Sequence, residues 1–93
     1  MRRCLIGDIT TAAAALSAAA PPDRPRLADR LLAEAHAAHS YAKRFAKPHP
    51  DWGNGSLMAR ALAVLPRSGG STDFAAMAEI LAALARFRTR CIE

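Results

Sequence analysis

Residues 23–46 read DRPRLADRLLAEAHAAHSYAKRFA, and this stretch decides the fold class. Apolar residues recur in it every three or four positions, which places them on one face of a helix. That face comprises Leu27, Leu31, Ala35, Ala38, Ala42 and Phe45. Asp23 can cap the start, and Pro25 suits the first turn because an N–H there has no helical partner. Proline disfavours helix in the residue before it, so Lys47-Pro48-His49-Pro50 ends the helix.

Three further helices are expected on either side of this one. The first opens at Gly7-Asp8, with Asp8 as its N-cap, and ends before Pro21-Pro22. A short helix covers residues 57–65 with either Asn54 or Ser56 as its cap, and after a turn at residues 66–70 the last runs from residues 71–73 to about 90. No stretch reads as a strand. The sequence therefore predicts an all-α single domain, residues 1–93, of four helices joined by short Pro/Gly turns, with helices 24–46 and 71–90 as the main packing pair.

The composition limits how large a core this domain can build. Hydrophobic residues make up 52% of the chain, but aromatics are only 5% and 23 of the 93 residues are alanine. A chain of this length hides only about 60–65% of the surface that it exposes when unfolded, which leaves room for one modest core. The expected core residues are Ile9, Leu16, Leu27, Leu31, Ala38, Phe45, Trp52, Leu62, Phe74, Met77, Leu81 and Leu84.

The net charge is +5, from eleven arginines and two lysines against eight carboxylates. This basic balance keeps nucleic acid, an anionic membrane surface and an acidic protein open as partners. Cys4 and Cys91 lie near opposite ends in no metal or redox spacing, which favours a reducing compartment. The apolar stretch after Met1-Arg2-Arg3 imitates a secretory signal, but Asp8 interrupts it, and no stretch approaches the ~20 apolar residues of a membrane span. We expect a cytoplasmic protein that does not enter membranes.

A nucleic acid would meet the outer face of the helix over residues 24–46. The cations that could contact its phosphates are Arg26, Arg30, Lys43, Arg44 and Lys47. However, Asp29 interrupts the series, and the last three also suit a helix C-terminus. No aromatic residues interleave with the cations as stacking on single strands would require. A solvated basic face is the alternative interpretation.

The turn from Trp52 to Ser56 is the most distinctive local feature. Its two glycines allow positive φ, and backbone N–H groups in such a turn at a helix start can bind an anion. With the nearby cations, the candidate anion site is Lys47, Gly53, Asn54, Gly55, Ser56 and Arg60. The structural alternative is that Trp52 fills the core while the glycines and Asn54 only cap the following helix.

No arrangement of residues indicates catalysis, so we expect no enzyme activity, no catalytic residue and no cofactor. His36 and His39 lie one helical turn apart, and His49 and Asp51 follow. This spacing matches no metal motif, and the histidines read better as hydrogen-bonded or solvated side chains.

The last helix carries a cation within its apolar stripe, which consists of Phe74, Met77, Leu81, Leu84 and Cys91 and is widened by Ile80 and Phe87. Arg88 projects into the same arc as Met77, Leu81 and Leu84. Because burying an unpaired guanidinium is costly, Arg88 must reach solvent along apolar surface, pair with a carboxylate or face a partner. The candidate interface is Phe87, Arg88 and Ile92, and leftover apolar surface at Phe87, Ile92 and Leu65 could support a homodimer.

Three segments of the chain resemble a family of proteins. They are Leu5-x-Gly7-Asp8, Leu31-Leu32-Ala33-Glu34-Ala35, and His49-Pro50-x-Trp52-Gly53-Asn54-Gly55-Ser56-Leu57-Met58. Together they resemble a small alphaproteobacterial family with no established function, over roughly residues 5–65, and the Trp52–Met58 segment is the specific part. The resemblance implies a compact helical protein of the bacterial cytoplasm. It implies no activity, cofactor or site residue.

We therefore expect a small non-enzymatic helical interaction module that contacts a protein partner. The first alternative is a nucleic-acid-binding protein that uses the basic face of the helix over residues 24–46. The second is a regulator that binds an anion at the Gly53–Ser56 turn.

Overall fold

Four α-helices make up the fold in the computed structural model, which describes residues 3–65 and 73–92, the last two by backbone alone. The helices are α1 (Ile6–Ser17), α2 (Arg24–Phe45), α3 (Leu57–Val64) and α4 (Phe74–Ile92), and a 3-10 turn, η1 (Pro21–Asp23), precedes α2. The described residues form no strand, so the predicted all-α class is confirmed. The turn expected at residues 66–70, and the start of the last helix at residues 71–72, lie outside the described residues.

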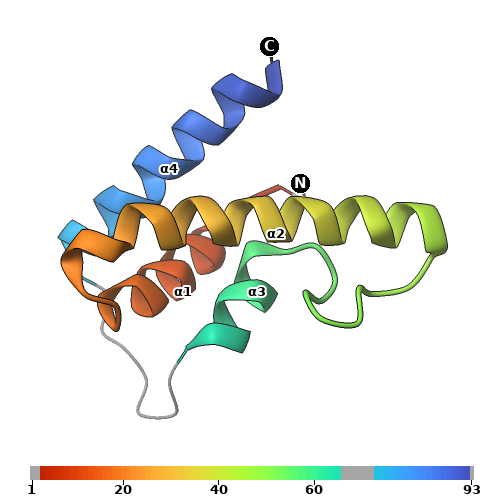
Figure 1. Ribbon diagram of the computed structural model, residues 1–93, viewed down its shortest axis with the longest axis horizontal. Coiled ribbons are helices and arrows are strands. Elements are labelled where there is room, and N and C mark those ends of the chain that lie inside the picture. The colour runs from red at the N-terminus through yellow and green to blue at the C-terminus, as the bar shows by residue number, and fades with distance from the viewer. Residues whose placement is uncertain (1–2, 66–72, 93) are drawn as a thin grey trace.

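The helices surround α1 rather than forming a single dominant pair. Figure 1 shows α2 lying across α1 and α3, while α4 leads away from the other helices toward its C-terminal end. The α2–α4 contact that the sequence predicts is present, but α1 packs equally extensively against both α3 and α4. The α2–α4 pair, which the sequence predicts to dominate the packing, is therefore one of three helix pairs with comparably extensive contact.

Small side chains explain why α1 occupies the centre. Its buried positions include Ala12, Ala13 and Ala15 beside Ile9 and Leu16. Alanine lets neighbouring helix backbones approach closely, so a short helix can contact two others along its length. The largest fully buried side chains come from all four helices: Leu16, Leu31, Leu32, Leu57 and Ile80.

The predicted core is wrong at four large residues. Phe45, Leu62, Phe74 and Leu81 have exposed fractions of 51%, 54%, 89% and 49%. In α4 the buried residues are Ala76, Ile80 and Ala83, each one position before a residue of the predicted stripe. One residue advances a helix by about 100°, so α4 buries Ile80 between two alanines and leaves Phe74 and Leu81 exposed. Leu27, Trp52, Met77 and Leu84 are only partly buried.

The helix starts also differ in part from expectation. Helix α1 begins at Ile6 with Leu5 as its N-cap, which makes Asp8 its third residue and not its cap. Asp23 precedes α2 but makes no side-chain capping bond, because η1 already gives it helical backbone angles. Of the two caps that the sequence allows for α3, Asn54 and Ser56, the structure uses Ser56, whose hydroxyl accepts a hydrogen bond from the Ala59 N–H at 3.0 Å.

The carboxylate of Asp8 joins the starts of α1 and α3. Its Oδ2 accepts a hydrogen bond from the Leu5 N–H at 2.8 Å, and its Oδ1 accepts one from the Met58 N–H at 2.9 Å. Both donors belong to first turns, whose N–H groups have no partner within the helix. Asp8 is 6% exposed, and it is the one buried charged residue among those described. A single side chain thus satisfies two helix ends that lie 50 residues apart in sequence.

We expect Asp8→Ala to lower the free energy of unfolding by about 2–4 kcal/mol, because two partly buried N–H groups at helix starts lose a charged acceptor. That loss corresponds to a fall in melting temperature of about 10–25 °C for a domain of this size. Thermal denaturation followed by circular dichroism measures it. The matched control is Asp51→Ala, which removes an exposed carboxylate and should cost less than about 0.5 kcal/mol. Equal losses in both variants would contradict the role assigned to Asp8.

Candidate functional site

The loop between α2 and α3 folds back on itself around His49. Ala46 ends α2 in the left-handed conformation, with φ of 56°. The backbones of His49 and Gly53 then pair in both directions, at 2.8 and 3.2 Å. His49 Nδ1 accepts hydrogen bonds from the N–H groups of Asp51 and Trp52, at 3.0 and 3.1 Å. These bonds fix the imidazole in place and leave its ring proton on Nε2.

Four aromatic side chains meet where this loop returns to α2. The rings of His49 and Trp52 stack with centroids 4.8 Å apart and an interplanar angle of 9°. Tyr41 contacts His49 edge-on at 4.9 Å and Phe45 at 4.6 Å. We call Tyr41, Phe45, His49 and Trp52 the aromatic cluster. The sequence analysis missed it, although the four-residue spacing of Tyr41 and Phe45, two lone aromatics on one helix face, was a usable signal.

The aromatic cluster lies among cations that also come from the end of α2. Lys43, Arg44 and Lys47 are exposed. The Arg44 guanidinium carbon lies 5.5 Å from the centroid of the Phe45 ring, within the range of a cation–π contact. The prediction that no aromatic residues accompany the cations is therefore wrong, because the loop brings His49 and Trp52 back beside Tyr41 and Phe45.

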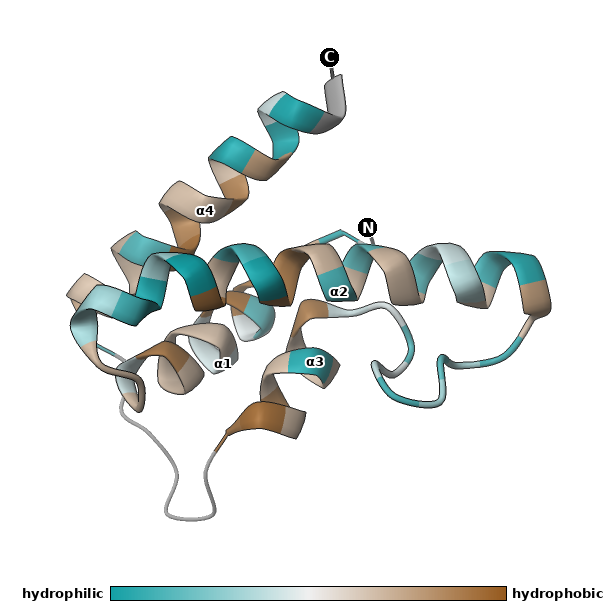
Figure 2. Cartoon of the chain, viewed as in Figure 1, coloured by the Kyte–Doolittle hydropathy of each residue, from teal (hydrophilic) through white to brown (hydrophobic). Residues whose placement is uncertain are grey.

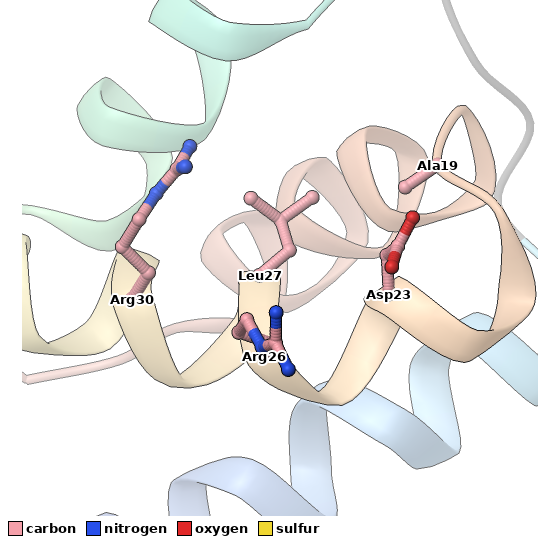
Figure 3. A pocket seen from close by; sticks show the side chains of 5 residues that line it. All are labelled: Ala19, Asp23, Arg26, Leu27 and Arg30. Carbon is pink, nitrogen blue, oxygen red and sulfur yellow. The ribbon is translucent and has the colours of Figure 1, made fainter.

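The other two predicted phosphate contacts, Arg26 and Arg30, lie at the opposite end of α2. Thirteen residues separate Arg30 from Lys43, about 20 Å along a helix, so the five cations form two separate groups. Arg26 and Arg30 line a surface pocket of about 310 Å³ with Ala19, Asp23 and Leu27. Figure 3 shows the two guanidinium groups pointing away from each other, and Arg30 also lies 3.9 Å from Glu34. The two arginines do not converge on one ligand position.

The turn proposed to bind an anion already uses several of its donors. The Ser56 N–H donates to Asn54 Oδ1 at 3.0 Å, and the Met58 N–H donates to Asp8. The Asp8 carboxylate therefore already occupies the position at the start of α3 where an anion would bind. Arg60 is 12% exposed and binds Glu34 at 2.7 Å, which directs it toward α2. Of the candidate anion ligands, only the exposed Lys47 and Asn54 face solvent widely. An anion site here stays a prediction that this geometry does not favour.

The two glycines of this turn adopt backbone conformations and close contacts that the fold requires. Gly53 and Gly55 both have positive φ, 82° and 96°. A Cβ on Gly55 would lie 2.6 Å from His39 Cα, against the backbone of α2, whereas one on Gly53 would lie 3.3 Å from Ala59 Cβ. Gly55 therefore lets the start of α3 touch α2, which holds the loop and the aromatic cluster in place.

The remaining histidines and the cysteine supply no evident reactive group. His36 packs edge-on against Phe87 at 5.4 Å, and partial burial lowers its pKa. Burial raises the pKa of the Cys4 thiol, whereas a nucleophilic thiol needs a lowered pKa. Among the described residues, no three His, Cys, Asp or Glu side chains gather where they could hold a metal ion. None of the described helices combines the length and apolar character needed to cross a membrane.

Helix α4 exposes two large apolar side chains on one face, Phe74 and Leu81. We call Phe74, Met77, Leu81, Leu84 and Arg88 the outer face of α4. Phe74 and Leu81 are exposed, Met77 and Leu84 are half-buried at its edge, and Arg88 is exposed. Met77 and Leu84 also pack against the core, but Arg88 is exposed and therefore needs no buried partner, which resolves the conflict that the sequence raised.

The other residues of the predicted interface lie elsewhere. Phe87 turns inward against His36 and Leu65 packs against the core, while the side chain of Ile92 lies outside the described residues.

The family comparison covers most of the chain. A family model described as Domain of unknown function (DUF7742) matches residues 2–87. No curated protein and no solved structure matches the chain.

We expect Gly55→Ala to destabilise the domain more than Gly53→Ala. Positive φ costs a non-glycine residue about 1–3 kcal/mol at either position, but only at Gly55 must the new Cβ also displace a helix backbone. The difference should exceed about 1 kcal/mol in urea denaturation followed by Trp52 fluorescence. A smaller cost for Gly55→Ala than for Gly53→Ala would show that α3 does not need this close approach.

Proposed function

The chain belongs to the DUF7742 family, and we propose that it works as a non-enzymatic helical interaction domain whose contact surface is the outer face of α4. The observation that carries this proposal is which face of α4 is buried. The helix buries Ala76 and Ala83 and leaves Phe74 89% exposed. Exposed large apolar side chains that share one helix face are typical of protein contact sites. Figure 2 shows the hydrophobic part of α4 followed by hydrophilic residues along its last turns.

The charges along α4 leave its outer face apolar. Between residues 74 and 85 the only charged residue is Glu79. Two residues advance a helix by about 200°, so Glu79 lies on the side opposite Leu81. Asp73 stands just before the helix, and Arg86, Arg88 and Arg90 come near its end. The face is therefore bounded by one negative and one strongly positive end.

The partner that these charges fit is a second copy of the chain in antiparallel orientation. A parallel pair would bring the arginine-rich ends together, whereas an antiparallel pair brings each of them to the other copy's Asp73. Phe74 and Arg88 each lie seven residues from Leu81. Pairing centred on Leu81 therefore sets Arg88 of each copy over the other copy's Phe74, a cation–π contact that uses both exposed side chains. A single-helix interface is small, so the dimer should be weak.

We expect Leu81→Glu to raise the dimer dissociation constant at least tenfold, because the new carboxylate would be buried without a partner. Sedimentation velocity between about 1 μM and 1 mM measures it, the range in which an interface below about 1,200 Å² can assemble. The matched control is Leu62→Glu, which changes an equally exposed leucine of α3 and should leave self-association unchanged.

A wild-type chain that stays monomeric throughout would contradict self-pairing. In that case, the wild-type chain and Leu62→Glu could still capture another protein from nuclease-treated lysate while Leu81→Glu does not. This result would support the proposed interaction domain, but with a partner other than a second copy. Finding neither would refute the proposed function.

A further inference from the structure

We infer that the aromatic cluster and the cations at the end of α2 form a stacking site for single-stranded nucleic acid. The site is Phe45 and Tyr41, supported by the His49–Trp52 stack and flanked by Arg44 and Lys47. It lies on a different element from the outer face of α4, so it neither requires nor excludes the proposed interaction.

Phe45 is the ring that offers a free surface. It is 51% exposed, whereas Tyr41, His49 and Trp52 are half-buried behind it. Contacts of 4.6 to 4.9 Å link the four rings in the order Phe45, Tyr41, His49, Trp52. The hydrogen bonds from two backbone N–H groups to His49 Nδ1 immobilise the far end of this series. A ring held in this way loses little conformational freedom when a base stacks on it.

The cations around Phe45 are available for phosphates. Lys47 makes no ion pair with any described residue, and Arg44 lies over the Phe45 ring. Lys43 is two residues from both Tyr41 and Phe45, so it lies on the opposite side of α2 and does not belong to the site. From residue 35 to residue 72 the chain has a single carboxylate, Asp51. Figure 1 shows this end of α2 and its loop lying away from α4. The site thus combines one exposed ring with two exposed cations, Arg44 and Lys47.

The chemistry of this combination selects a single strand. Bases in a duplex are stacked on each other and cannot reach a protein ring, whereas unpaired bases can stack on aromatic side chains and gain a cation–π contact from arginine. Cations beside the ring, here Arg44 and Lys47, contact the phosphates of such a strand. His49 adds one hydrogen-bond donor, Nε2–H. Because stacking accepts every base, we expect little sequence preference.

The chain's single tryptophan makes the site directly measurable. Trp52 lies in the aromatic cluster, so its fluorescence should be quenched saturably by an oligothymidine of about 12 nucleotides, within the usual site size of stacking proteins. Phe45→Ala should weaken binding about tenfold, and Phe45→Tyr should retain it. Arg44→Gln with Lys47→Gln should reduce the slope of log affinity against log salt by about 1.4, the value for two phosphate contacts on a single strand.

The matched control removes the same charge from the other end of α2. Arg26→Gln with Arg30→Gln should change the affinity by less than about twofold, because about 20 Å exceeds the screening length at 0.1 M salt. The inference is overturned if this control weakens binding as much as the Arg44 and Lys47 pair, since attraction would then be diffuse. It is also overturned if Phe45→Ala binds like the wild type, if duplex binds as tightly as the single strand, or if no quenching occurs. Circular dichroism checks that each variant is folded.

Discussion

The contact on which the fold depends is the one between the Asp8 carboxylate and two helix starts. Backbone N–H groups in first turns need acceptors, and in a short helix they are a large share of all its polar groups. Asp8 supplies one acceptor oxygen to α1 and the other to α3, at 2.8 and 2.9 Å. This links a helix from each half of the chain and sets the start of α3 beside α1. Glu34 adds a second link to α3 by binding Arg60 at 2.7 Å.

With α3 placed, the loop before it has little freedom. Ser56 caps α3, and Gly55 presses the loop against the backbone of α2 at His39. The chain must then return from Ala46 within a few residues, which it does by closing the His49–Gly53 pair. The aromatic cluster is a consequence of this closure, because His49 and Trp52 are carried back over Tyr41. The features that first suggested an anion site thus serve to assemble a different surface.

The alanine-rich composition shapes the other end of the molecule. A helix that buries Ala76 and Ala83 can approach α1 and α2 more closely than one that buries methionine and leucine. With alanines on both sides of the buried Ile80, Phe74 and Leu81 of the same helix remain exposed. The molecule thus carries two distinct surfaces: an apolar face on α4 and an aromatic, basic one at the end of α2.

The sequence alone determined the helices, because periodicity and helix-ending prolines are local signals. The bounds of α2 and the Ser56 cap follow from residues within a few positions of each other. Only the tertiary structure decided the roles of Asp8, Gly55 and the outer face of α4. Periodicity shows that α4 has an apolar arc, but the choice between Ile80 and Leu81 as the inward residue depends on how closely its neighbours approach. Likewise, no local pattern reveals that Asp8 meets Met58, because the two residues are 50 positions apart. The donor is a backbone N–H, which almost any residue has, so the identity of Met58 gives no signal either.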